Sequence, residues 1–291
     1  MTFGDDTETY GELKKILLER YDSAIKNGIL NPTIKAILKE EYQRKESQYN
    51  ENQLVFSFDE TLDNPIQSRE GFIQSLDNLS KRFFDSRKLA LKNTEYYLSL
   101  VNDLDVYVAT SMRKREDFRK MAETCERIFK DDKIKNFDLR YFDPTISAAF
   151  GHEDKGLIEC LMVKCAKVLI YSVGEQESWG KDAEAAMALS LGKPVIFYCD
   201  EEQKKNFYKD VHPLSRLIDF STGVAVGAIV TDKINEVVEI LSRIFENKLE
   251  YELDQIKPGY YRLKEKITKS IIRLQTNDRL LTKSFWNSYN K

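Results

Sequence analysis

The sequence predicts an α/β fold: a parallel, flavodoxin- or Rossmann-like sheet flanked by helices, with a helical N-terminal domain and a helical C-terminal tail. Three observations support this prediction. Short apolar segments alternate with amphipathic segments of helical period between about residues 104 and 245, a pattern typical of βαβ units. Helical spacing of apolar residues also runs through the first hundred residues and returns after the sheet. We therefore expect three domains, at residues 1–102, 103–248 and 249–291.

The N-terminal region has helical spacing but no ligand-binding motif. Apolar residues form a stripe over residues 10–25, and the spacing resumes over residues 72–100. Between them, Asn31-Pro32 has the pattern of an N-cap followed by a proline in the first helical turn. We interpret residues 1–102 as an accessory or oligomerisation domain, and we expect a homo-oligomer that forms through the helical regions.

The composition is that of a folded protein. The 291 residues are 42% hydrophobic and 32% charged, and the net charge of −3 neither favours nor excludes a nucleic-acid partner. Four cysteines without a CxxC pair predict reduced thiols in the cytoplasm. Because there is no signal-peptide pattern and no apolar run of the ~20 residues that cross a bilayer, we expect no membrane association. With 2 histidines, no metal site is predicted.

The α/β region contains five segments with the composition of buried strands. They are short, apolar and rich in β-branched or aromatic residues, and a helical pattern follows each: residues 104–110, 137–144, 168–172, 194–199 and 225–230. Strands that alternate with helices form a parallel sheet covered on both faces. Ligands of such sheets bind beyond the carboxyl ends of the strands. The loops that follow the strands are therefore the candidate binding loops.

Nine candidate substrate-binding residues and one candidate catalytic carboxylate follow the strands. After the first strand come Thr110, Ser111, Met112 and Arg113, after the second Asp143, and after the third Ser178, Trp179, Gly180 and Asp182, followed by Glu184. Ser111 can donate to a phosphate and Arg113 can neutralise one, unless residues 113–115 are simply a solvated basic loop. The chain has no GxGxxG after its first strand and no GxxxxGK[ST]. An ordinary dehydrogenase or P-loop nucleotide triphosphatase is therefore disfavoured.

Glu184 has two interpretations. An acidic residue near the start of a helix is stabilised by the helix dipole, by ~0.3–1 kcal/mol. The alternative is a functional carboxylate, because small residues follow it and Gly180 lets the backbone approach a ligand closely. Ser178 and Trp179 add a hydroxyl and a flat aromatic face suited to a sugar or a base. Asp182 and Glu184 are two positions apart on the helix, so they do not face each other as an acid–base pair.

Residues 165–198, CAKVLIYSVGEQESWGKDAEAAMALSLGKPVIFY, resemble the nucleoside 2-deoxyribosyltransferase family and the related TIR-type NAD hydrolases. The resemblance lies in Gly180-x-x-x-Glu184 at the start of a small-residue helix and in Gly192-Lys193-Pro194 before the next strand. Residues 106–112, VYVATSM, resemble the first strand and substrate loop of that family. The transferases usually carry Thr-Ala after the first glycine, where this chain has Lys181-Asp182. The resemblance covers about residues 105–200.

The resemblance implies cleavage of the bond between ribose and base in NAD, a nucleoside or a nucleotide. Glu184 would attack the anomeric carbon or stabilise its positive charge. Nicotinamide leaves without a proton, whereas a purine or pyrimidine needs one, for which Asp143 and Tyr141 are candidates. The small molecule is the substrate, neither a metal nor an organic cofactor is required, and a role in bacterial defence is implied. The alternative is a catalytically silent module that binds a nucleotide-type signal.

The C-terminal region is basic. Residues 257–291 hold nine Lys and Arg against two acidic residues, with aromatic residues interleaved, a composition also found in nucleic-acid-binding segments. Leu263, Ile267, Ile271 and Leu274 form an apolar stripe with helical spacing. We therefore predict an amphipathic helix that packs on the protein or on a second subunit, and we do not expect nucleic acid as a partner.

Overall fold

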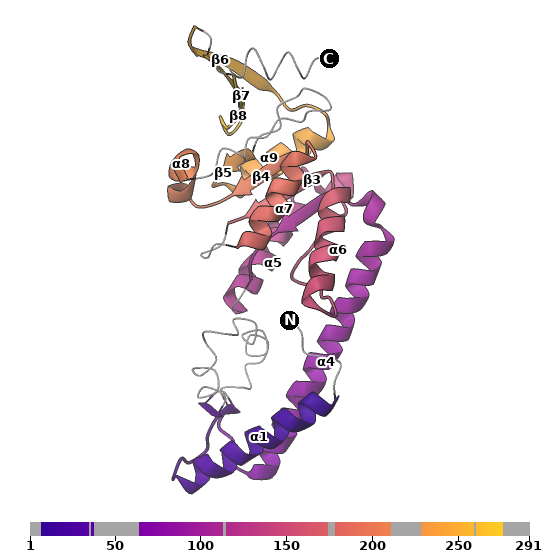
Figure 1. Ribbon diagram of the computed structural model, residues 1–291, viewed down its shortest axis with the longest axis vertical. Helices are drawn as coiled ribbons and strands as arrows, with labels where there is room; N and C mark the ends of the chain where they lie inside the picture. Colours follow the sequence, from indigo (N-terminus) through magenta and orange to yellow (C-terminus); the bar gives the residue numbers. More distant parts are fainter. Residues whose placement is uncertain are drawn as a thin grey trace. The chain divides into compact units, whose positions relative to one another are not determined.

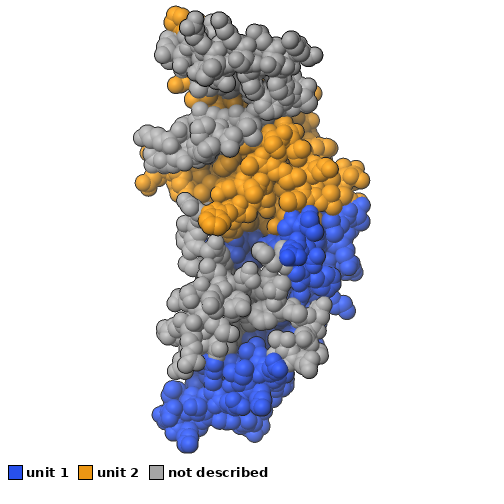
Figure 2. Space-filling view, in the orientation of Figure 1, with its two compact units in different colours: residues 1–99, 112–121, 145–158 blue, residues 100–111, 122–144, 159–291 orange. Residues whose placement is uncertain are grey.

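The computed structural model describes residues 7–34, 36–37, 64–112, 115–173, 178–210, 228–258 and 260–275. The chain divides into two compact units, coloured separately in Figure 2. Unit 1 comprises residues 1–99, 112–121 and 145–158, and unit 2 comprises residues 100–111, 122–144 and 159–291. Unit 1 therefore includes two segments that the sequence assigns to the α/β region.

Unit 2 contains the predicted parallel sheet, so the α/β fold class is confirmed. Its five strands lie in the order β2-β1-β3-β4-β5, and every neighbouring pair is parallel. The strands are β1 (Val106–Ala109), β2 (Tyr141–Phe142), β3 (Val168–Ser172), β4 (Val195–Tyr198) and β5 (Ala228–Thr231). The chain moves from β1 to β2 on one side and from β3 to β5 on the other. The topological switch point therefore lies between β1 and β3.

Helices connect the parallel strands, as Figure 1 shows. The connecting helices are α5 (Arg115–Phe129), α6 (His152–Cys165), α7 (Trp179–Ser190) and α8 (Glu201–Asp210), and α9 (Ile234–Phe245) follows the last parallel strand. The strands between them are buried: each residue of β1 and β5 is buried, as are the first four residues of β3. A sheet covered on both faces explains why these strands are continuous apolar runs rather than alternating ones.

The strand register places aromatic side chains on one face of the sheet. Tyr107 of β1 pairs with Phe142 and Leu169, and Tyr171 of β3 pairs with Phe197. Because parallel partners project to the same side, these residues share a face. The Tyr107 and Phe142 rings stack with centroids 5.1 Å apart, and the Tyr171 and Phe197 rings stack at 4.4 Å. The hydroxyls of both tyrosines are directed at α7.

The Gly192-Lys193-Pro194 motif has a structural explanation. Gly192 takes a positive φ of 74°, and the amide of Lys193 donates to the carbonyl of Ala188 at 3.0 Å. This is the glycine-containing termination common at helix C-termini. The Lys193 ammonium also donates to the carbonyls of Val163, at 2.9 Å, and of Lys164 and Ala166. One lysine thus helps to end α7 and also caps α6, whose last carbonyls have no partner within the helix.

The predicted C-terminal helix is wrong over residues 251–275. This segment forms an antiparallel sheet of β6 (Tyr251–Lys257), β7 (Tyr260–Glu265) and β8 (Ile271–Gln275) in sequence order. The turn after β7 is held by Glu265, a fully buried carboxylate that accepts the backbone amides of Ile267 and Thr268, both at 2.7 Å. The hydroxyl of Ser270 accepts the Val230 amide at 2.8 Å. The last 16 residues, 276–291, lie outside the described part of the chain.

Unit 1 contains a helical hairpin. Helix α1 (Thr7–Lys26) and the long helix α4 (Arg69–Ser99) pack antiparallel, with Tyr21 stacked on Phe72 at 4.7 Å. Two ion pairs join the helices, Lys14 with Asp77 at 2.6 Å and Arg69 with Asp22 at 2.9 Å. The helical character predicted for residues 10–25 and 72–100 is confirmed. No described helix is long and apolar enough to cross a membrane.

The four cysteines differ in burial, which predicts their reactivity. Burial raises the pKa of Cys125 to about 12 and that of Cys199 to about 11, and neighbouring carboxylates add to both shifts. Cys160 is exposed. Because the thiolate is the reactive form, iodoacetamide at pH 8 is expected to label Cys160 in the native protein and to spare Cys125 and Cys199 until denaturant is added. Peptide mass spectrometry checks the order, and rapid native labelling of Cys199 would contradict it.

Candidate active site

The candidate site lies at the carboxyl edge of the sheet in unit 2, around the switch point. Thr110 and Ser111 follow β1, and Asp143 follows β2 directly; all three are half-buried. Since β1 and β2 are neighbouring parallel strands, the structure brings these predicted residues to the same edge. Helix α7 begins a few residues after the carboxyl end of the next strand, β3.

Glu184 lies in the second turn of α7 and is half-buried. Its Oε1 accepts a hydrogen bond of 3.0 Å from the hydroxyl of Tyr107, whose side chain reaches α7 from the middle of β1. A hydrogen bond to a charged group contributes about 1.5–3 kcal/mol, so this contact fixes the carboxylate in one orientation. Glu184 therefore has a specific hydrogen-bond partner on the face of the sheet. Stabilisation of the helix dipole would not by itself require such a partner.

Tyr107 remains protonated at any ordinary pH. It is 1% exposed, and burial raises its pKa well above the usual value. The charge of Glu184 raises that pKa further, as does the charge of Glu159. Because the phenol keeps its proton, it acts as a permanent hydrogen-bond donor to Glu184 and leaves that carboxylate free to carry the negative charge.

Glu159 is a residue that the sequence analysis did not select. It lies on α6, where it shares one helix face with Met162 and Val163, which are both fully buried. It is half-buried, and its charge acts on Tyr107. Two carboxylates, Glu159 on α6 and Glu184 on α7, therefore influence the same tyrosine hydroxyl. Because hydrophobic residues lie on both sides of α6, the sequence pattern held no signal that could have identified it.

A second carboxylate–tyrosine pair lies two residues earlier in α7. The hydroxyl of the buried Tyr171 donates to the carboxylate of the exposed Asp182. Between these two pairs lies Lys181, which is 3% exposed. The Lys181 ammonium donates to the carbonyl of Ser172 at 3.0 Å and lies 4.5 Å from the centroid of the Tyr171 ring. Asp182 and Glu184 thus project to different tyrosines, as their spacing predicted.

The other predicted site residues lie at the start of α7 or follow β1 in the chain. Ser178 is the N-cap of α7 but forms no side-chain cap hydrogen bond, while Trp179 is 88% exposed. Met112 belongs to unit 1, and Arg113 lies outside the described residues.

Tyr141 was a weaker candidate for proton transfer, and this prediction is wrong. Its register partner Val106 projects to the face opposite Tyr107, where the Tyr141 ring stacks on Phe129 at 3.7 Å.

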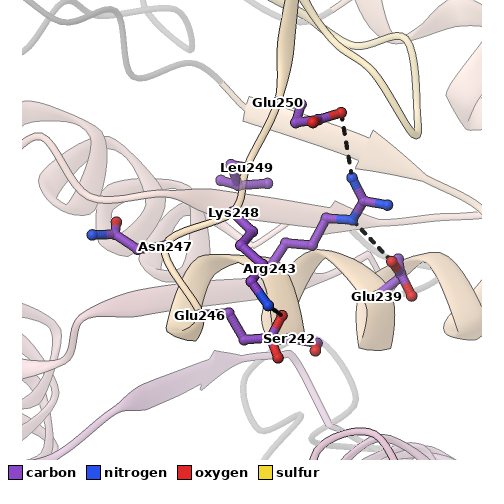
Figure 3. Close-up of a pocket in the computed structure, with 8 residues that line it drawn as sticks. All are labelled: Glu239, Ser242, Arg243, Glu246, Asn247, Lys248, Leu249 and Glu250. Carbon is purple, nitrogen blue, oxygen red and sulfur yellow. Dashed lines mark hydrogen bonds and ion pairs between the residues drawn. The ribbon is translucent and has the colours of Figure 1, made fainter.

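A surface pocket of about 530 Å³ lies elsewhere in unit 2, at the end of α9 (Figure 3). Its charged lining is largely paired: Arg243 contacts Glu239 at 2.9 Å and Glu250 at 3.9 Å, and Lys248 contacts Glu246 at 3.1 Å. Helix α9 begins beside the carboxyl end of β5 and runs back along the sheet, so its end lies at the opposite edge from Glu184. We therefore do not take this pocket as the functional site.

Within the described residues, no group of His, Cys, Asp or Glu could hold a metal ion.

Comparisons with known proteins add little to this geometry. Neither a described protein family nor a curated protein matches the sequence. Among solved structures, "Solution Structure of BlsM" aligns with a TM-score of 0.32 and 16% identity, over 51% of this chain and 93% of that chain. We infer nothing about activity from a likeness at this level.

Proposed function

We propose that unit 2 is an N-glycosidase that cleaves the bond between ribose and base in NAD, a nucleoside or a nucleotide. The observation that carries the proposal is the 3.0 Å hydrogen bond from the buried Tyr107 hydroxyl to the Glu184 carboxylate. It orients a half-buried anion on the helix that begins at the carboxyl edge of a parallel sheet, and ligands of such folds bind at this edge. The resemblance of residues 165–198 to a family with this chemistry supports the same conclusion.

In this mechanism the C1′–N bond breaks and its electron pair stays with the departing base. The ribose carbon becomes positively charged, and the Glu184 carboxylate bonds to it or stabilises it electrostatically. Water then adds its hydroxyl to C1′ and releases one proton. The nicotinamide of NAD leaves as a neutral molecule without further help.

A neutral purine or pyrimidine base leaves as an anion unless it gains a proton. We assign that proton to Glu159, which lies on the same side of the sheet as Glu184 and acts on the same hydroxyl. Two carboxyl groups with different tasks are the usual arrangement of glycosidases. Thr110, Ser111 and Asp143 follow the neighbouring strands and are assigned to substrate binding.

The direct test is release of base by the purified full-length protein. The protein is incubated at several concentrations with NAD and with a panel of ribo- and deoxyribonucleosides and their monophosphates, and free base is measured by liquid chromatography. Accumulation of base that grows with time and with protein concentration supports the proposal. Binding of a nucleotide that is never consumed would overturn it and would favour the alternative of a silent sensor.

A further inference from the structure

Lys181 is a buried cation at the start of α7. Its side chain is 3% exposed, yet it belongs to the polar first turn of the helix. Burying an ammonium is unfavourable unless it gains partners, and here the partners are the Ser172 carbonyl, at 3.0 Å, and the face of the Tyr171 ring. Burial lowers the pKa of Lys181, and the charges of Asp182 and Glu184 oppose that shift. The residue is therefore stabilised in its charged form by the two carboxylates that follow it.

The contact made by Lys181 joins the helix to the strand that precedes it. Ser172 is the last residue of β3, and the N-cap residue Ser178 makes no side-chain bond to the helix. Lys181 thus holds the first turn of α7 against the end of the strand. Glu184 is three positions further on, on the same side of the helix as Lys181. A displacement of this turn would move the Glu184 carboxylate away from Tyr107.

We propose that Lys181 is a positioning residue for Glu184: its ammonium anchors the first turn of α7 to β3 and so holds the carboxylate in contact with Tyr107. The kinetic consequence rests on the proposed glycosidase function, whereas the structural consequence does not. In the family that residues 165–198 resemble, threonine is usual at this position.

The ¹³C NMR signal of the Glu184 carboxyl carbon tests whether Lys181 positions Glu184, and this test needs no catalytic turnover. The protein is labelled with ¹³C at glutamate side-chain carboxyl carbons, and the Glu184 signal is assigned by its loss in Glu184→Gln. Lys181→Met removes the ammonium with little change in volume, and it is expected to shift the Glu184 signal at pH 7. The matched control is Lys193→Met, because Lys193 also binds backbone carbonyls at a helix end but caps α6 instead. That control is expected to leave the Glu184 signal in place.

The kinetic part separates positioning from binding. Lys181→Met is expected to lower kcat by about 10- to 100-fold with KM nearly unchanged, since a small displacement of a reacting group costs this much. Lys181→Arg keeps a charged donor and is expected to recover most of kcat. Circular dichroism establishes that each variant is folded, and Lys181→Gln replaces the Met variant if that one is not.

Two results would overturn the inference. One is an unchanged Glu184 signal in folded Lys181→Met, and the other is an equal shift in Lys193→Met. A wild-type protein that releases no base would instead refute the glycosidase proposal. In that case the carboxyl signal would still decide whether Lys181 positions Glu184.

Discussion

Glu184→Gln is expected to lower base release by at least about 10³-fold. The amide has no negative charge with which to attack or stabilise the ribose carbon, and loss of a nucleophile or of a preorganised electrostatic contact costs this much or more. The amide oxygen can still accept the Tyr107 hydroxyl, so the fold and ligand binding are expected to persist. Steady-state rates and substrate binding by calorimetry, measured on the same preparation, separate these effects.

The matched control for this variant is Asp77→Asn in unit 1. Asp77 is also a carboxylate that accepts a tyrosine hydroxyl, that of Tyr10 at 2.9 Å, but it belongs to the contact between α1 and α4. Its replacement is expected to leave turnover within about twofold of wild type, because an exposed ion pair contributes only ~0–1 kcal/mol. Full activity of Glu184→Gln, or equal losses in both variants, would exclude Glu184 as the catalytic carboxylate.

The sheet of unit 2 could be predicted because its strands are buried on both faces. Residues 168–171, for example, contain no charged residue, and helical segments of the expected length separate such runs. The sequence could not, however, identify the partner of Glu184. Tyr107 appears in the sequence as one aromatic residue in an apolar strand, and only the register with Leu169 places it on the face that α7 covers.

Helix α6 has hydrophobic residues on both its buried and its exposed side. Leu157 and Leu161 appear to belong to an apolar stripe, yet Leu157 is 73% exposed and Leu161 is also exposed. The buried side instead carries Met162 and Val163, with Glu159 one turn earlier. Since hydrophobic residues occur on both sides of this helix, periodicity alone does not identify its inward face or place Glu159 on it.

The C-terminal error has a local cause. The spacing of Leu263, Ile267 and Ile271 fits a helix, but these residues fall in β7, in the turn and in β8. Pro258-Gly259 precedes two tyrosines and is a turn signal between extended segments. That dipeptide, with the β-branched pair Ile271-Ile272, favoured a hairpin over a continuous helix.

Glu159→Gln is expected to separate substrates by the chemistry of their leaving groups. If Glu159 supplies the proton, cleavage of a nucleoside with a neutral base should fall by about 10²- to 10⁴-fold, the usual contribution of a general acid. Cleavage of NAD should change little, since nicotinamide needs no proton. Where the protein accepts only nucleosides, guanosine and 7-methylguanosine provide the same contrast, because the methylated base already carries the positive charge. Glu153→Gln, an exposed acid on the same helix, is the control and should leave both rates unchanged. Equal losses for both leaving groups would show that Glu159 acts through Tyr107 and the position of Glu184 rather than by proton transfer.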